Sequence, residues 1–573
     1  MTIYAVISPL IGALLLFLKN EPNARFVPWT IGVTSMLASC FFLFSSFPTE
    51  QSSSQIISLF SFLHTPSLSL DIKVKVDFIS YALLGIICII SLFITIFCLP
   101  YSKTKPNTDN LLAKLLMAIF ALMLLSIANS PILLFLAFIL TSLFSYVSSN
   151  FYLQRYRTNQ ASLTALAMNI SADFMILAGI ISTLIYKEET TPAIIGWLVL
   201  ISILIKGGQI PFGLWVSETM ETPSPVAAFV NSLVIPVSSF TLFQIFAPLL
   251  TTHGLIPWLC IIAIISALAS SIVALVQFEI KKIISYSTIA ITALVLLALA
   301  NDNTSLALMI LALHAIAKAL LFLTYASVIQ ASSGEHDIRA IGGLGKVLKF
   351  SCFNAIIGSG VIILLADIFI FNTFSPAYTF IGTIISALIT LSLSRLVAYT
   401  FFGKIFGIDA IIARLKPESK QAVLSLIGLS VIAIVTTFIF ISDIGIKISW
   451  FFVVGTLFAI AYITISFSRN FSLRELFENK YPKLYFFIYS GFGASAFYQA
   501  FLPSFTKDAG NFLLNEASKL SGSITAATSL FSSPAKDEEK PDTSPEYSFK
   551  KHLAVMAIGI FLFLLFSFLL KEI

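Results

Sequence analysis

The sequence predicts an all-α membrane protein that crosses the bilayer many times. Of its 573 residues, 58% are hydrophobic and 11% are charged, which leaves too little polar surface for a soluble globular protein of this length. The mean hydropathy of the chain is +0.96. Apolar runs of roughly 17 to 25 residues, long enough for helices that span a bilayer, recur along the whole chain and give about sixteen expected transmembrane helices.

The expected helices follow one another from the first residues onward. They begin near Ile3, Pro28, Asp77, Ala113, Pro131, Ser162, Ala193, Pro225, Pro257, Lys282, Thr304, Phe350, Tyr378, Gln421, Trp450 and Leu553. The first run has no basic segment before it and no small-residue cleavage pattern after it, so we expect a retained span and not a signal peptide. Lys and Arg fall mainly in alternate early loops, which predicts an N-terminus on the outer side of the membrane.

The C-terminal part of the chain has a different composition. Residues 468–531 mix charged residues with Leu and Phe at helical spacing, which predicts a lateral amphipathic segment that does not cross the membrane. Residues 532–550 are polar and rich in proline, as in a flexible linker, and residues 551–573 contain a terminal anchor helix. The remaining parts are N-terminal transmembrane helices over 1–112, a core over 113–410 and C-terminal transmembrane helices over 411–467.

The cysteines and the net charge exclude several kinds of site. The five cysteines all lie in apolar runs without CxxC spacing, so they predict core packing and no metal site, iron–sulfur cluster or disulfide framework. The net charge of +6 is spread over loops, where Lys and Arg set the topology of a membrane protein. No basic run indicates binding to nucleic acid.

One expected span contains a lysine and is then interrupted. Lys206 ends an apolar run and is followed by Gly207, Gly208 and Pro211. A charged side chain at the centre of a bilayer costs at least about 2.5 kcal/mol, and such residues usually serve ion or proton pathways. Backbone groups freed by a helix break are tolerated there only where protein or water satisfies them. The stretch therefore predicts a protonation site at a broken helix; the alternative is a structural kink whose lysine pairs with an acid for assembly.

Other ionisable residues lie inside or beside the expected spans. These are Asp173 in the sixth span, Glu218 after the broken seventh, His314 and Lys318 in the eleventh, Asp367 in the twelfth and Arg395 in the thirteenth. His314 and Lys318 are four residues apart and share one helix face. Because a nearby acid controls the protonation of a buried lysine, and a histidine can relay protons near neutral pH, the series predicts a proton pathway. The alternative is a set of interhelical hydrogen bonds and ion pairs that support folding.

Four segments carry a resemblance to a known family. Residues Lys206–Trp215 and Glu279–Thr288 resemble the antiporter-like subunits of respiratory complex I and their relatives among the multisubunit cation/proton antiporters. Residues His314–Leu323 and His336–Leu344 point more narrowly to subunit L, the chain 5 type, of bacterial NADH-quinone oxidoreductase. The resemblance runs the full length of the chain and includes the lateral segment and the final anchor.

The resemblance implies a membrane-arm subunit that couples electron transfer to the translocation of protons or another cation. Residues 113–410 would form an antiporter-like core with two broken helices, one near Lys206 and one near Asp367. Each break would belong to a half-channel. The implied proton-translocation residues are Lys206, His314, Lys318, Asp367, Arg395, Asp173 and Glu218.

The resemblance also implies which chemistry lies in other subunits. The chain is expected to have no catalytic centre, cofactor or metal of its own, because NADH and quinone react elsewhere in such complexes. The expected partners are the lipid bilayer and the other membrane-arm subunits, with no nucleic acid. The expected location is the bacterial inner membrane.

Several positions depart from the family pattern. The glutamate of the fifth span is Ile139 here, so that helix lacks the acid that would pair with Lys206, and Asp173 or Glu218 would have to supply the charge. The family's histidines in the seventh and eighth segments are Gly213 and Asn231, its arginine before Asp173 is Ile170, and its lysine beside Asp367 is Ala366. The alternatives are therefore a non-pumping structural subunit, the membrane subunit of a two-component inorganic-carbon transporter and an Mrp-type Na⁺/H⁺ antiporter.

Overall fold

A computed structural model describes ten stretches of the chain. These are residues 1–18, 26–46, 55–64, 69–102, 108–151, 156–185, 190–372, 376–402, 418–444 and 480–493. All of them belong to one compact unit, Met1–Gln499. The predicted linker and terminal anchor lie outside the described residues, as does most of the lateral segment, of which only residues 480–493, with α20 (Pro482–Tyr489), are described.

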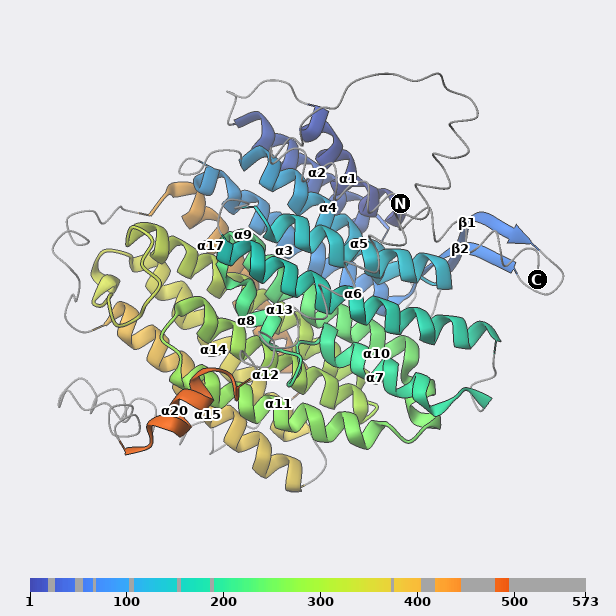
Figure 1. The fold of residues 1–573 in the computed structure, drawn as a ribbon. Helices are drawn as coiled ribbons and strands as arrows, with labels where there is room; N and C mark the ends of the chain where they lie inside the picture. The colour runs from blue at the N-terminus through green and yellow to red at the C-terminus, as the bar shows by residue number, and fades with distance from the viewer. Residues whose placement is uncertain are drawn as a thin grey trace, which may run out of the picture. The chain divides into compact units, whose positions relative to one another are not determined.

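The described chain is mostly helical, as predicted (Figure 1). Twelve of its helices are long and apolar enough to cross a membrane. Two further apolar helices, Thr2–Leu18 and Ala193–Lys206, are shorter. The helices outside the central region are α1 (Thr2–Leu18), α2 (Phe26–Phe44), α3 (Phe78–Ser102), α4 (Thr108–Ile127), α15 (Pro376–Phe401) and α17 (Lys420–Ile444). The expected spans near Trp450 and Leu553 lie outside the described residues.

The central region begins at α5 and continues through α14. Its helices are α5 (Pro131–Ser149), α6 (Tyr156–Ile185), α7 (Ala193–Lys206), α8 (Leu214–Glu218), α9 (Ser224–Phe229), α10 (Ile235–Thr252), α11 (Ile256–Val276), α12 (Ile280–Ala300), α13 (Thr304–Ala331) and α14 (Lys349–Asn372). Short 3-10 segments are η2 (Thr219–Glu221) and η4 (Leu344–Lys346), and η3 (Val230–Val234) is a π-helix between α9 and α10. Proline occupies the first turn of α5, α9 and α11, where its missing N–H removes no helical hydrogen bond.

A β-hairpin, which was not among the expected elements, interrupts the helices between α2 and α3. Strand β1 (Gln55–His64) pairs antiparallel with β2 (Ser69–Val76), with two shifts in register. The alternation of charged and apolar residues from Asp71 to Val76 has the period of a strand, so the signal was present in the sequence. The hairpin projects from the helices in Figure 1, and Val74 forms an isolated bridge with Ala128 before α5.

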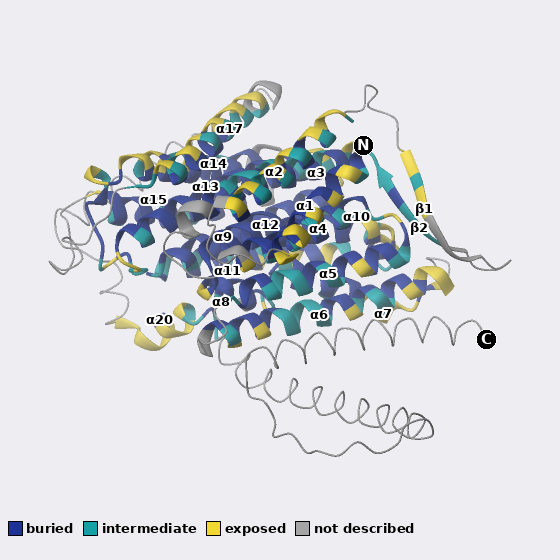
Figure 2. Cartoon of the chain, turned by 90° about the horizontal axis from the view of Figure 1, so that it is seen from above, coloured by how far each residue is buried: buried dark blue, intermediate teal, exposed yellow. Residues whose placement is uncertain are grey.

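The two most buried helices lie at the centre of the described region. In both α12 and α13, 94% of the most apolar window is buried, whereas the corresponding share is 28% in α2 and α17 (Figure 2). α12 packs against α11 and α13, and α13 also packs against α14, α17 and the π-helix η3. Any charged side chain on the inner face of α13 is therefore separated from lipid by protein.

The expected break after Lys206 is present. α7 ends at Lys206, and the chain turns before α8 begins at Leu214. Gly208 has a φ of +64°, in the left-handed region that glycine adopts without strain. A Cβ atom on Gly213 would lie 2.2 Å from the carbonyl oxygen of Gly208, so no side chain fits there in this conformation.

The expected second break, near Asp367, is wrong for this chain. α14 is one continuous helix from Lys349 to Asn372 and passes through Asp367 without interruption. The physical reason is local, because residues 361–372 contain neither glycine nor proline and their apolar side chains favour an unbroken helix in a bilayer. Only one of the two broken helices predicted from the family resemblance is therefore found among the described residues.

We expect Gly213→Ala to destabilise the broken helix, because the added methyl group meets a backbone oxygen that cannot move away as a side chain would. Overpacking of this kind typically costs about 1–3 kcal/mol. Thermal unfolding of the purified protein would measure the loss. Gly360→Ala in α14 is the matched control, since a Cβ there meets nothing within 4 Å. Equal unfolding temperatures for the two variants would contradict the close approach at Gly213.

Candidate functional site

Lys206 forms a buried ion pair at the helix break. Its ammonium nitrogen lies 2.6 Å from Oδ1 of Asp173, which comes from the middle of α6. The Lys206 side chain is 3% exposed and that of Asp173 is 1% exposed. Loss of one partner from such a pair leaves an uncompensated buried charge, which typically costs about 3–5 kcal/mol. The two residues therefore depend on each other for their charged forms.

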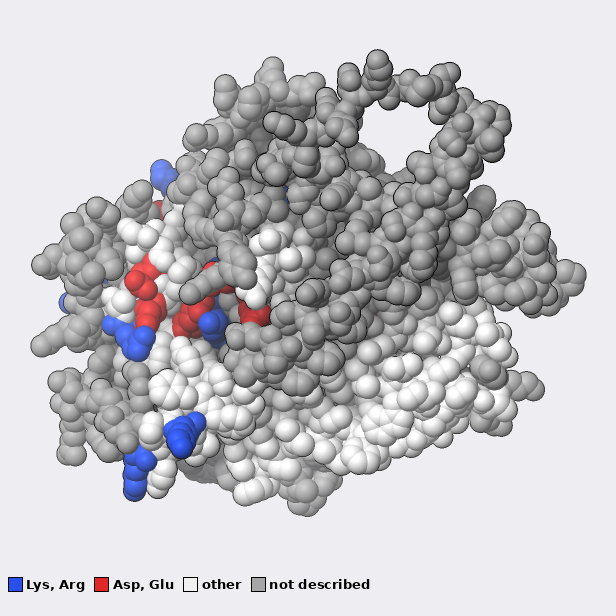
Figure 3. Space-filling view, viewed as in Figure 1, with Lys and Arg blue, Asp and Glu red and all other residues white. Residues whose placement is uncertain are grey.

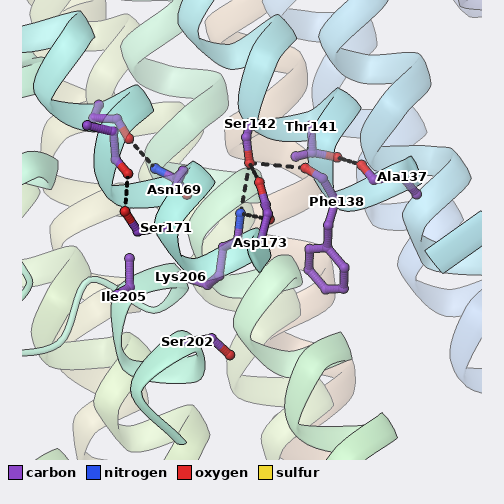
Figure 4. Close-up of polar contacts among 12 residues, drawn as sticks. Ala137, Phe138, Thr141, Ser142, Asn169, Ser171, Asp173, Ser202, Ile205 and Lys206 are labelled. Atoms are coloured by element: carbon purple, nitrogen blue, oxygen red, sulfur yellow. Dashed lines mark hydrogen bonds and ion pairs between the residues drawn. The ribbon is translucent and has the colours of Figure 1, made fainter. Parts of the chain in front are cut away.

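Ser142 of α5 touches both members of this pair (Figure 4). Lys206 Nζ donates to Ser142 Oγ at 2.8 Å, and Ser142 Oγ donates to Asp173 Oδ2 at 2.6 Å. The hydroxyl also lies 3.0 Å from the carbonyl oxygen of Phe138, but its single hydrogen can serve only one acceptor at a time. The shorter contact is with the carboxylate, where a charge-assisted hydrogen bond is the stronger one.

The pairing settles which residue compensates Lys206 in place of an acid on the fifth span. Position 139 carries isoleucine, and the carboxylate comes from the neighbouring helix α6. Phe138 adds an aromatic ring 5.5 Å from the Lys206 ammonium nitrogen. The other acid considered, Glu218, is half-buried at the end of α8, where its charge interacts with Lys282. The structure thus joins Lys206 to Asp173 and not to Glu218.

Ser142 is the residue of this site that inspection of charged residues missed. A serine in an apolar helix carries no charge and most often bonds to its own backbone. The spacing of serines could have indicated this residue. Ser142, Ser145 and Ser149 recur at intervals of three and four along α5 and therefore share one face of the helix.

Lys318 is the centre of a second buried group. Its side chain is fully buried in α13, and its ammonium donates at 2.7 Å to the carbonyl oxygen of Ile284 and also to the hydroxyl of Ser287, both on α12. These acceptors are neutral. Lys318 thus differs from Lys206 in the kind of group that compensates its charge.

His314 lies one turn before Lys318 and is also fully buried. Among the described residues, neither of its ring nitrogens has a hydrogen-bond partner. The π-helix η3 packs against α13, and the ring lies beside the backbone of Asn231 in η3. Asn231 Nδ2 donates to Ala227 O, whereas its Oδ1 has no partner in the described part of the chain. Buried polar atoms of this kind are usually satisfied by water, and π-helical turns often occur at functional sites.

Two further candidate residues lie on α14 and α15. Asp367 is buried in α14, 3% exposed. Arg395 of α15 is 7% exposed, donates to the carbonyl oxygen of Gln277 and stacks over the ring of Phe278 at 5.3 Å. Arg395 therefore holds the segment that connects α11 to α12, next to the helix that carries the acceptors of Lys318.

The loop after α13 covers the same connecting segment. Ile280 N donates to His336 O and Ile338 N donates to Phe278 O, each at 3.0 Å. Arg339 in this loop binds Asp337 and lies 4.3 Å from the centre of the Phe278 ring. In the view of Figure 3 acidic and basic side chains of the described residues form one mixed cluster, further basic side chains lie apart from it, and most of the remaining described surface is uncharged.

Acidification is expected to weaken the attachment of this loop through His336. Burial and the positive charge of Lys281 lower the pKa of His336 below its usual value, despite the nearby Glu279, Glu221 and Glu335. As the pH falls through about 6.5, the unfolded chain takes up a proton that the folded chain binds more weakly, so stability is lost below that pH.

His336→Gln should therefore lose less stability than the unchanged protein between about pH 7.5 and pH 5.5. The difference between the two proteins in stability lost per pH unit should stay well below about 1.4 kcal/mol, because the His336 ring is only half-buried and solvent screens its charge. Thermal unfolding at several pH values measures it. Parallel curves for the two proteins would show that His336 does not titrate differently on folding.

The central helices match a known family of membrane proteins. Residues 128–359 match the family described as NADH:quinone oxidoreductase/Mrp antiporter, transmembrane region. NADH-ubiquinone oxidoreductase chain 5 of Trichophyton rubrum is 28% identical over 338 residues, which cover 56% of this chain and 51% of that protein. Chain 5 of Rhinoceros unicornis is 26% identical over 434 residues, which cover 70% of each. This chain resembles NADH-ubiquinone oxidoreductase chain 5, in diverged form.

The likeness to chain 5 confirms the family resemblance expected from the four sequence segments. The chain spans about half the length of the first curated relatives that it matches. The family match includes Asp173, Lys206, Glu218, His314 and Lys318, whereas Asp367 and Arg395 lie beyond its last residue. The first five candidate residues thus fall within the part of the chain for which the family is recognised.

The fold also has a counterpart among solved structures. A chain of the membrane-bound sulfane sulfur reductase, an archaeal respiratory membrane complex, superposes with a TM-score of 0.65 at 17% sequence identity. The superposition covers 97% of this chain and 99% of that one. At this identity the likeness confirms the fold of a polytopic antiporter-like membrane protein.

Proposed function

We propose that this chain is a membrane subunit of a complex I-like respiratory assembly and that it translocates protons through buried lysines. The Lys206–Asp173 pair at the helix break carries the proposal, because a buried ammonium beside a carboxylate can exchange its proton when the pair is disturbed. An ionisable residue inside the membrane marks an ion or proton pathway by default. The broken helix allows the pair to be approached by water or by other polar groups.

The proposed pathway continues through the second buried group. His314 and Lys318 lie on one face of α13, and the imidazole ring of His314, which can carry a proton on either nitrogen, lies beside the backbone of Asn231. Lys318 would hold the proton between the two halves of the pathway. Asp367 and Arg395 would complete it on the far side of α13, with Glu218 near the end of the broken helix.

The proposed partners follow from the same comparison. The subunits of a complex I-like assembly would carry the NADH and quinone chemistry, and this chain would need no cofactor of its own. We place it in a bacterial inner membrane with its N-terminus outside. Residues 113–410 would form the translocating core between helices 1–112 and 411–467, and residues 468–531, followed by the linker and the anchor, would hold neighbouring subunits.

A sodium/proton antiporter of the Mrp type is the second candidate, because the matched family includes such antiporters. The two functions differ in their partners and in their ion. Purification of the native complex and identification of the proteins that migrate with it would distinguish them. Redox subunits and proton uptake driven by NADH would support the first, and Na⁺-dependent proton release without redox subunits would support the second.

A further inference from the structure

Two cysteine thiols meet where α2 packs against α3. The thiol of Cys40, on α2, is in hydrogen-bond contact with that of Cys88, on α3. The two residues are not joined by a disulfide in the structure. α2 also packs against α1 and α4, so the pair lies among the N-terminal helices (Figure 1). Both cysteines precede residue 128, where the family match begins, and neither belongs to the site described above.

A chain of hydrogen bonds orients the two thiols. Ser39 Oγ donates to Ala5 O at 2.7 Å, which uses its single hydrogen, and its contact with Met123 Sδ at 4.0 Å is much longer. The contact between Ser39 Oγ and Cys88 Sγ at 3.0 Å therefore takes its hydrogen from Cys88. The Cys88 sulfur is then left to accept from Cys40. The two sulfurs thus face each other, and a thiolate formed at either one can accept a hydrogen bond from the remaining thiol.

The two thiols differ in their access to the outside of the protein. Cys40 is 9% exposed, whereas Cys88 is fully buried. Leu37 and Phe44 lie three residues before and four residues after Cys40, on the same side of α2, and they are 51% and 60% exposed. Exposed apolar side chains on a helix that can cross the membrane suit contact with lipid chains, which are as apolar as leucine. A reagent that reaches Cys40 therefore comes from the lipid phase.

We infer that Cys40 and Cys88 form an oxidisable dithiol that reduces hydroperoxides of the lipid phase and closes to a disulfide between α2 and α3. Cys40 attacks the peroxide, because it is the thiol that can be reached. Cys88 then resolves the oxidised Cys40, because its sulfur is already in contact with that of Cys40. The inference does not depend on the proposed role in proton translocation.

The reaction balances without a further oxidant or reductant. The Cys40 sulfur attacks one oxygen of the hydroperoxide and the O–O bond breaks, which gives a sulfenic acid at Cys40. The other oxygen leaves as an alcohol with the proton that Cys40 has lost. The Cys88 sulfur then attacks the sulfenic sulfur, the S–O bond breaks and the S–S bond forms. The hydroxide leaves as water with the Cys88 proton, so two electrons pass from the two thiols to one peroxide.

Oxidation by cumene hydroperoxide, which dissolves in lipid, tests the pair in the full-length protein. Native membranes are treated with the peroxide, the remaining thiols are blocked with a maleimide, and the digested protein is analysed by mass spectrometry without reductant. Cys98 is the internal control, since it is 7% exposed on α3 and lies ten residues after Cys88, about 15 Å along the helix axis.

The expected result is a peptide that links residues 40 and 88, with both thiols lost about tenfold faster than the thiol of Cys98 and restored by dithiothreitol. Loss of the two thiols no faster than that of Cys98, or loss without the linked peptide, would overturn the inference.

A pair of serine variants tests which thiol attacks. In Cys88→Ser the sulfenic acid at Cys40 has no resolving thiol, so it should be trapped by dimedone during peroxide treatment. In Cys40→Ser the buried Cys88 should take up no dimedone. Dimedone at Cys88 in Cys40→Ser, with none at Cys40 in Cys88→Ser, would contradict the assigned order. If either variant fails to accumulate, the linked peptide in the unaltered protein still decides whether the disulfide forms.

Discussion

Replacement of Asp173 by alanine is expected to abolish proton uptake and to destabilise the folded protein. Lys206 would keep its buried position but lose the carboxylate 2.6 Å from its ammonium nitrogen. Removal of one partner from a buried pair typically costs about 3–5 kcal/mol, a large share of the stability of a folded domain. Thermal unfolding of the purified complex would measure the stability, and proton uptake by reconstituted vesicles would measure the activity.

An exchange of the two side chains provides the control for this variant. Ser142→Asp combined with Asp173→Ser keeps one carboxylate and one hydroxyl within reach of Lys206, because Ser142 Oγ already lies 2.8 Å from its ammonium nitrogen. We expect the double variant to be more stable than Asp173→Ala and to recover part of the uptake. If Asp173→Ala unfolds at the temperature of the unaltered protein, the ion pair contributes nothing to stability and its role here is wrong.

Replacement of Lys318 by alanine is expected to remove proton uptake while the protein remains assembled. The acceptors of Lys318 are neutral, and Ser287 Oγ also lies 2.8 Å from Ile284 O, so no buried charge is left unpaired. Loss of a proton-transferring group typically lowers a rate by about 10²-fold or more. Uptake by vesicles and the yield of intact complex would be measured on the same preparation.

Two other lysines serve as controls for Lys318. Lys206→Ala should reduce both uptake and stability, because it leaves Asp173 unpaired in a buried site. Lys73→Ala on β2 should change neither, since its ion pair with Asp71 is partly exposed and such pairs contribute about 0–1 kcal/mol. Full uptake in Lys318→Ala would exclude the proposed pathway between the two halves of the core.

The transmembrane helices were predictable because the signal for each is local. A run of apolar residues in a bilayer must form a helix so that its backbone N–H and C=O groups are hydrogen-bonded, whichever helices pack against it. Lys206 with Gly207 and Gly208 marked the true break in the same way. The second break was expected from the family resemblance alone, and the unbroken apolar sequence around Asp367 forms a continuous helix. The alternation of charged and apolar residues in β2 indicates a strand. It was not predicted, because it is short and lies between long apolar runs that indicate helices.

The sequence by itself determined the membrane class, the expected spans that lie in the described residues and the set of ionisable residues within them. Only the tertiary structure decided that Asp173 pairs with Lys206 and that Ser142 joins them. The physical reason is that hydropathy and helix breaks depend on neighbouring residues in the chain. An ion pair between α6 and α7, with a hydroxyl from α5, depends instead on how three helices pack against one another.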